Sequence, residues 1–307
     1  MKKILSLVIP CYNEEETIKL FIKETQKYEW QLSEQLDFEY IFVNDGSKDN
    51  TLKVLKKISV VKNIHYISFS RNFGKESALL AGLRFSSGDF IVVMDVDLQD
   101  PPKILGNMYE KIKEGYDVVG TRRINREGEP RFRSFCANLF YKIMSHISET
   151  PIVNGARDYR MMTRQVVDSV LNVQEVNRFS KGIFSWVGYD TYYIDFENEE
   201  RVAGKTSWNF WSLFKYSIEG FINFSEALLN IATYSGMLAF LISFVGMIFV
   251  FIRKIIFGDQ VDGWTSMVII ILFIGAIQLF CIGILGKYIS KIFLETKKRP
   301  SDVKSSF

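Results

Sequence analysis

Two carboxylates stand one residue apart in this chain, directly after an apolar run. Residues 90–94 predict a buried strand, and Asp95 and Asp97 follow it. Like charges this close repel each other, and burial penalises each of them. A divalent cation would remove both costs, and carboxylate oxygens suit Mg²⁺ or Mn²⁺. An ordinary acidic turn is the alternative interpretation, because two Asp residues with this spacing are common.

The segments around this pair alternate between strand and helix patterns. We expect strands at residues 4–9, 39–43, 64–69, 90–94 and 117–121. We expect helices at residues 15–28 and 75–85, with another beginning near residue 50. This alternation predicts a mostly parallel α/β sheet with helices on both faces. Ligands bind such sheets outside the carboxyl ends of the strands. Asp95 and Asp97 stand at one of those ends, so we favour the metal-binding interpretation.

The turns after the first two strands carry carboxylates at the same edge of the predicted sheet. Glu14 lies in the turn at residues 10–15, and Asp45 lies in the turn at residues 44–47. Both side chains could accept hydrogen bonds from a ribose or a base. Capping of the helices that follow is an equally compatible interpretation.

Several function classes do not fit the sequence. No G-x-G-x-x-G pattern follows the first strand, which argues against a dinucleotide cofactor. The net charge of +3 creates no strong basic field for nucleic acid. The 2 histidines are isolated, which leaves little for a histidine-based hydrolase. The 3 cysteines form no C-x-x-C pair, which fits a reducing compartment.

The last third of the chain changes in composition. Residues 227–251 and 265–285 are apolar, and each run is long enough to cross about 30 Å of hydrocarbon as a helix. Buried core helices are the alternative. Basic residues follow the second run, namely Lys287, Lys291, Lys297, Lys298, Arg299 and Lys304. They predict a cytoplasmic tail, and two spans would return the chain to its starting side. We therefore expect a multi-pass protein of the plasma membrane with its N-terminal domain in the cytoplasm.

Two further segments mix aromatic and charged residues in a way that favours the membrane interface. They are residues 207–226 and 132–147, for which packing against the soluble domain is the alternative. The predicted organisation is therefore a catalytic domain at 1–206, an interfacial helix at 207–226, a two-helix membrane region at 227–290 and a basic tail at 291–307.

Seven sequence motifs follow one another along the chain and span most of residues 4–210. They are VIPCYNEE (8–15), VNDGS (43–47), SRNFGKE (70–76), MDVDLQDPP (94–102), GTR (120–122), DYRMM (158–162) and RVAGKTS (201–207). This series resembles the inverting glycosyltransferases of family 2, which have the GT-A fold. The resemblance is to the bacterial polyprenyl-phosphate glycosyltransferases related to dolichol-phosphate mannose synthase. The Asp pair alone is weak evidence, but the whole series is specific.

The resemblance implies a role for each motif. Catalytic roles fall to Asp158 and Asp97, and metal ligation to Asp95, Asp97 and Gln99. The nucleotide sugar would be bound by Pro10, Tyr12, Glu14, Asp45, Lys75, Asp95, Arg201 and Lys205. The acceptor phosphate would be bound by Arg122, Arg131, Arg133, Ser134 and Ser207, and which arginine contacts it stays open. Arginine suits this task because it makes bidentate contacts to phosphate and is permanently charged.

The implied reaction is transfer of a hexose, with glucose favoured, from a UDP-sugar to polyprenyl (undecaprenyl) phosphate with inversion. The lipid-linked sugar would serve cell-envelope glycosylation, the cofactor would be Mg²⁺ or Mn²⁺, and two-span members could pack as tetramers. A processive polysaccharide synthase is an alternative, but residues 174–179 (QEVNRF) differ from its Q-x-x-R-W motif. A non-catalytic membrane scaffold or flippase subunit is the other, and the intact motif residues argue against it.

Overall fold

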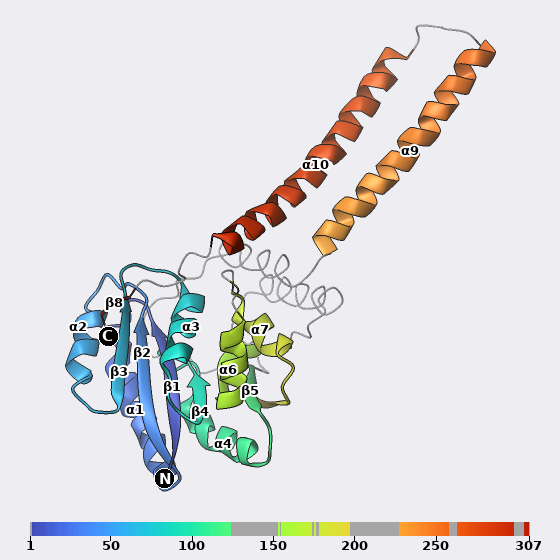
Figure 1. Cartoon of the computed structure of the whole chain (residues 1–307). Coiled ribbons are helices and arrows are strands. Elements are labelled where there is room, and N and C mark those ends of the chain that lie inside the picture. The colour runs from blue at the N-terminus through green and yellow to red at the C-terminus, as the bar shows by residue number, and fades with distance from the viewer. Residues whose placement is uncertain are drawn as a thin grey trace. The chain divides into compact units, whose positions relative to one another are not determined.

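The computed structural model describes residues 2–123, 153, 155–173, 175, 178–196, 227–257, 263–297 and 304–306 (Figure 1). The chain divides into two compact units. The first comprises Met1–Tyr216 together with Arg299–Phe307, and the second comprises Ser217–Lys298. The finer four-part division expected from the sequence stays a prediction.

The first unit contains one eight-stranded sheet. Its strands are β1 (Lys3–Cys11), β2 (Leu36–Asn44), β3 (Ile64–Phe69), β4 (Phe90–Val93), β5 (Val118–Arg123), β6 (Ala156–Thr163), β7 (Thr191–Phe196) and β8 (Lys304–Ser306). The order across the sheet is β7-β5-β6-β4-β1-β2-β3-β8. The central strands β4, β1, β2 and β3 are parallel, whereas β6 runs antiparallel to both β4 and β5. The mostly parallel α/β sheet predicted from the sequence is confirmed.

The helices of this unit pack on the sheet and on one another. They are α1 (Thr17–Leu32), α2 (Thr51–Ile58), α3 (Lys75–Phe85), α4 (Leu105–Lys113), α6 (Arg164–Asn172) and α7 (Ser180–Trp186), with a 3₁₀ turn, η1, at Pro102–Ile104. Helix α3 contacts β1, β2 and α6, whereas α1 contacts α2, α4 and η1. The predicted third strand and the helix at 75–85 match β3 and α3 in their bounds.

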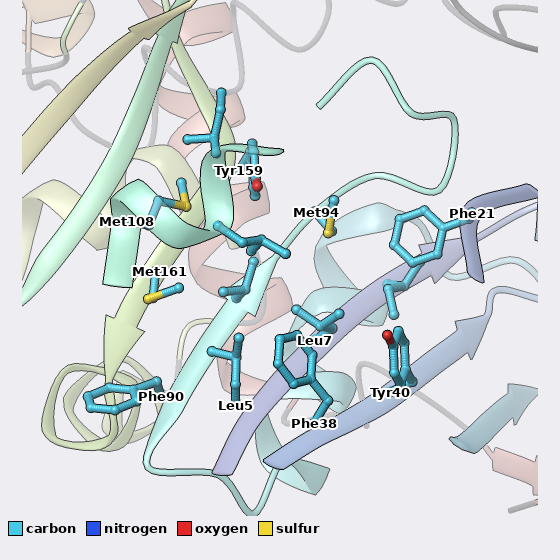
Figure 2. Packing of buried hydrophobic residues seen from close by; sticks show 14 of the residues in the cluster. Leu5, Leu7, Phe21, Phe38, Tyr40, Phe90, Met94, Met108, Tyr159 and Met161 are labelled. Atoms are coloured by element: carbon cyan, nitrogen blue, oxygen red, sulfur yellow. The ribbon is translucent and has the colours of Figure 1, made fainter. Parts of the chain in front are cut away.

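Strand β1 is buried on both faces, as a central strand must be. Leu5, Leu7 and Ile9 are fully buried in the large apolar cluster that Figure 2 shows in part. On the opposite face Val8 meets α3, where a Cβ added to Gly82 would lie 2.3 Å from the Val8 Cγ1 atom. Glycine at this position therefore allows α3 to approach the strand. The close packing holds the N-terminus of α3 beside the carboxyl ends of the strands.

Strands β6 and β7 were not expected from the sequence. Their partners are distant in the chain: β6 lies between β4 and β5, and β7 pairs in parallel with β5. The sequence of β6, ARDYRMMT, contains three charged residues and gives no continuous apolar run. Its position in the sheet is nevertheless central to the site, because its first residues lie beside the end of β4.

The second unit consists of two long helices, α9 (Ala227–Phe257) and α10 (Trp264–Thr296), which contact each other. Among the residues that the structure describes, one helical segment, Phe273–Thr296, is long and apolar enough to cross a membrane. Two spans are therefore not confirmed, although both predicted runs are helical. The predicted interfacial helices at 132–147 and 207–226 lie outside the described residues.

Candidate active site

One lysine links the two acidic motifs of the predicted site. The Lys75 Nζ atom lies 2.8 Å from Asp95 Oδ1 and 2.8 Å from Asp158 Oδ2. Lys75 is the first residue of α3, Asp95 follows β4, and Asp158 lies near the start of β6. The three side chains are 34%, 29% and 20% exposed, so solvent and a ligand can reach them. The structure therefore brings together three residues predicted from separate motifs.

Opposite charges keep Lys75 and Asp158 ionised. Burial alone would raise the pKa of the Asp158 carboxyl, but Lys75 and then Lys181 outweigh it and hold that pKa well below its usual value. Burial likewise acts to lower the pKa of the Lys75 ammonium, and the charges of Asp158 and Asp95 raise it overall. At neutral pH the cluster is an ion-paired triad, so Asp158 is a carboxylate with no proton to donate.

The acidic turn after β4 has an unusual backbone. Leu98 has φ of 59°, a left-handed conformation that side chains other than Gly, Asn and Asp seldom adopt. Its side chain is 8% exposed, so burial holds it in place. Asp97 is also buried, and its Oδ1 atom accepts a hydrogen bond from the Gln99 amide at 3.1 Å. Strain of this kind is found where surrounding structure fixes a functional geometry.

A further aspartate, Asp100, joins this turn to β6. The Arg157 Nε and Nη2 atoms both lie 3.3 Å from Asp100 Oδ1. The other oxygen, Oδ2, accepts a hydrogen bond from the Asp95 amide at 3.4 Å. Asp100 is 1% exposed, and burial raises the pKa of its carboxyl to about 6 although Arg157 acts in the opposite direction. Neither residue was among the site candidates predicted from the sequence.

Asp45 uses both carboxylate oxygens on the loop that precedes α3. Its Oδ1 atom accepts a hydrogen bond from the Phe73 amide at 2.6 Å, and its Oδ2 atom accepts one from the Gly74 amide at 2.9 Å. The next residue, Gly46, has φ of 65°, and a Cβ there would lie 2.2 Å from the Arg71 carbonyl carbon. Asp45 and Gly46 therefore fix the loop that presents Lys75.

The remaining nucleotide-site candidates gather at the ends of β1 and β2. Tyr12 is 37% exposed, and Pro10 is partly buried. Glu14 donates from its amide to the Thr51 hydroxyl at 2.9 Å and accepts at its carboxylate from the Thr17 hydroxyl at 2.7 Å. The Glu14 carboxylate thus contacts a side chain at the start of α1, but no side chain caps the N-terminus of that helix, so the capping alternative is not confirmed for Glu14.

Arg122, an acceptor-site candidate, is held by a partner on the neighbouring strand. Its Nε and Nη2 atoms lie 2.7 Å and 2.9 Å from the two Asp195 carboxylate oxygens. The two residues are paired in the register of β5 and β7. Six other candidates fall outside the described residues, namely Arg131, Arg133, Ser134, Arg201, Lys205 and Ser207.

A second contact joins α3 to the start of α7, directly after residues 174–179. Glu76 accepts hydrogen bonds from the Ser180 hydroxyl and from the Ser180 amide, the latter at 3.0 Å. The next residue, Lys181, is the second cation that lowers the pKa of Asp158. Arg178 instead donates to the Val173 carbonyl, 2.5 Å away. A serine 104 residues from its partner gives no local sequence signal for this contact.

The carboxylates after β4 can be judged by what a divalent cation requires of its ligands. Asp95 and Asp97 carry carboxylate oxygens, which are hard donors, directly after the end of β4. Within the described ranges, no group of three or more His, Cys, Asp or Glu side chains could hold a metal. Magnesium is commonly bound by one or two carboxylates together with substrate phosphates and water. The residues fit a cation shared with a bound diphosphate, and not an all-protein cage.

Comparison with known proteins agrees with these motifs. The model of glycosyl transferase family 2 matches residues 6–171. The bactoprenol glucosyl transferase of Shigella phage SfX is 41% identical over 297 residues, covering 96% of this chain and 97% of that protein. The prophage bactoprenol glucosyl transferase homolog of Escherichia coli (strain K12) is also 41% identical, covering 96% of each. An uncharacterized glycosyltransferase of Synechocystis sp. is 38% identical, covering 96% of this chain and 93% of its own. This chain belongs to glycosyl transferase family 2, as its motif series predicted.

Proposed function

We propose that this protein transfers glucose from UDP-glucose to polyprenyl phosphate, with inversion at the anomeric carbon. Relatives that are 41% identical over nearly their whole length are named bactoprenol glucosyl transferases, which supports both the sugar and the lipid. The observation that carries the proposal is the Lys75 bridge, because it unites Asp95 and Asp158 at the sheet edge where such folds bind ligands. The product would supply glucose for cell-envelope glycosylation.

The chemistry is a direct displacement. An oxygen of the lipid phosphate attacks the anomeric carbon, the bond from that carbon to the diphosphate breaks, and the electron pair leaves with UDP. The attacking oxygen is already part of an anion, so a general base contributes little. Asp158, held ionised by Lys75, is suited to orienting the sugar or the acceptor. Much of the rate would come from holding a lipid and a soluble donor in one geometry.

The departing diphosphate needs positive charge. Asp95 and Asp97, with Gln99, would hold Mg²⁺ or Mn²⁺ against it, and the bound cation would neutralise charge on the leaving group. Lys75 is already at this position, 2.8 Å from Asp95. It would turn from the carboxylates toward the diphosphate and stabilise the charge that develops there. Nucleotide contacts are assigned to Pro10, Tyr12, Glu14, Asp45, Arg201 and Lys205.

We assign the acceptor phosphate to three arginines and two serines, namely Arg122, Arg131, Arg133, Ser134 and Ser207. For Arg122 to take part, it would exchange its contact with Asp195 for the phosphate. The Arg122 and Asp195 side chains are 43% and 40% exposed, and ion pairs this exposed contribute little to stability. Breaking this pair should therefore cost little free energy.

We also propose that α9 and α10 both span the plasma membrane, with the catalytic unit in the cytoplasm. Large apolar side chains on both helices are exposed, among them Met237, Leu238, Ile242, Val245, Phe273, Leu279 and Phe280. Soluble proteins rarely expose contiguous apolar surface of this kind. Lys287 and the basic residues beyond it would anchor the cytoplasmic end. Assembly as a tetramer through these helices is a further expectation.

A donor screen tests the proposal. The full chain, purified in detergent, is given undecaprenyl phosphate, Mg²⁺ or Mn²⁺, and a panel of UDP- and GDP-sugars, and lipid products are identified by mass. We expect one product, a lipid-phosphate hexose from UDP-glucose, and its loss in Asp95→Ala. Conversion of a different donor would correct the sugar. Sugar released without any lipid product would refute the assignment of the acceptor.

A further inference from the structure

The acidic turn and the first residues of β6 are joined at two points. At the first, Arg157 contacts Asp100 through two nitrogens at 3.3 Å. At the second, the Tyr159 hydroxyl donates to the Pro101 carbonyl at 3.2 Å. Tyr159 is fully buried, and Figure 2 shows it among the core residues. We call these two contacts the clasp.

The clasp lies on the opposite side of β6 from the ion-paired triad. Successive side chains along a strand point to opposite faces, so Arg157 and Tyr159 face the turn while Asp158 faces Lys75. Fixing the residues on both sides of Asp158 fixes its backbone. From the other side, Arg160 donates to the Arg157 carbonyl at 2.9 Å and lies 4.1 Å from the Phe184 ring. The start of β6 is thus braced on both faces.

Asp100 also contacts the backbone of Asp95. The Asp100 Oδ1 atom contacts both Arg157 nitrogens, and its Oδ2 atom accepts a hydrogen bond from the Asp95 amide. A continuous chain of contacts therefore runs from the backbone of Asp95, through Asp100 and Arg157, to the residue before Asp158.

We propose that Arg157 is a positioning residue, which through Asp100 holds Asp95 and Asp158 at the separation that glucosyl transfer requires. The effect on glucosyl transfer rests on the proposed function, whereas the clasp can be tested independently of activity. Stability alone gives a weak reason for a charged pair here, since buried ion pairs can often be replaced by uncharged groups without loss of stability. A misplacement of about 1 Å at a reacting centre can cost about 100-fold in rate.

Three variants of the full chain in detergent separate positioning from a structural role. Arg157→Gln leaves Asp100 buried without its partner and is expected to lower both melting temperature and kcat. Combining Asp100→Asn with Arg157→Gln removes both charges, so the melting temperature should recover toward wild type. Arg157→Lys keeps the charge but loses the two-nitrogen contact. The matched control is Arg164→Gln, at the first residue of α6, just beyond the far end of β6. There the guanidinium donates to the Gly88 carbonyl at 2.7 Å, and the side chain is 30% exposed against 25% for Arg157.

The expected result is a kcat for UDP-glucose lowered about 100-fold in the double variant, with a smaller change in KM. Arg157→Lys should regain part of that loss, and Arg164→Gln should lower stability without lowering kcat. Recovery of kcat together with melting temperature in the double variant would overturn the proposal and leave the pair a structural contact. A wild-type protein that makes no lipid product would instead contradict the proposed function.

Hydrogen exchange tests the clasp whether or not the protein is active. A peptide covering residues 95–101 is followed by mass spectrometry, with a peptide from β2 as the internal reference. In the double variant the turn peptide should exchange faster while the β2 peptide is unchanged. Equal exchange of the turn in variant and wild type would refute the clasp.

Discussion

Replacing Lys75 with Met removes the cation that lies between the two carboxylates of the site. Methionine keeps the length and most of the volume of the lysine stem, so packing around α3 should survive. What changes is the charge balance, because Asp95 and Asp158 would then face each other without Lys75. We expect the variant to be both less stable and far less active.

The size of the stability loss can be worked from the two distances. At 2.8 Å each pair attracts by about 6 kcal/mol at an effective dielectric constant of about 20. The cost of burying the charges, several kcal/mol per ion, offsets much of this. Because the Lys75 side chain is 34% exposed, solvent screening weakens its attraction to the two carboxylates further. We expect a net loss of about 2 kcal/mol, and hence a melting temperature lower by about 4–8 °C.

The pH dependence has a definite sign. The pKa of Asp158 is lowered in the folded protein, so its contribution is present above its unfolded value of about 3.9 and is lost as the pH falls through the folded pKa. The pKa of Lys75 is raised, so its contribution is present below its unfolded value of about 10.4 and is lost as the pH rises through the folded pKa. The stability difference between wild type and variant should be largest between about pH 5 and pH 9.

The assay compares melting temperatures across that pH range and kcat/KM for UDP-glucose at neutral pH. Loss of a group that stabilises developing charge typically costs about 100- to 1,000-fold in kcat. Lys75→Arg is the matched control, because it retains the charge while altering its geometry. A Lys75→Met protein with wild-type melting temperature and activity would refute the reasoning about the triad.

Gly46→Ala should destabilise the protein by about 3 kcal/mol, seen as a lower melting temperature, because its Cβ would collide with the Arg71 backbone in a left-handed conformation. Wild-type stability would show that this loop can move aside. Asp45→Ala should cost about 2–4 kcal/mol by leaving the amides of Phe73 and Gly74 without acceptors, and Asp45→Asn, which keeps one acceptor oxygen, should cost less; equal melting curves would contradict that role. Removing divalent cations with EDTA should abolish transfer while Mg²⁺ or Mn²⁺ restores it, and full activity in EDTA would contradict the proposed metal.

The parts of the fold that the sequence predicted are those with continuous local patterns. Strand β3 and helix α3 are bounded by turn residues and carry regular apolar spacing, so their first and last residues could be predicted. Strand β6 was missed because Arg157, Asp158 and Arg160 interrupt its apolar pattern. Strand β6 is buried by its neighbours β4 and β5, which are distant in sequence, so the local hydrophobic pattern of β6 does not indicate them.

The site shows the same division. The acid pair was predictable because it follows a clear strand, and its turn residues mark the strand end. The Lys75 bridge was not, since its partners are 20 and 83 residues away and the contact depends on how α3 docks. Asp45 illustrates a third case, because the residue was singled out but the structure uses both of its oxygens to hold the 73–74 backbone.

The most direct test of the proposed reaction is the identity and anomeric configuration of the lipid product. UDP-glucose labelled with ¹³C at the anomeric carbon is incubated with undecaprenyl phosphate and the purified full chain, and the product is measured by mass spectrometry and NMR. We expect one glucose on the lipid phosphate in the β configuration, opposite to that of the donor, and none with Asp158→Ala. An α-linked product, a polymer, or free glucose with no lipid-linked sugar would contradict direct displacement by the lipid phosphate at this site.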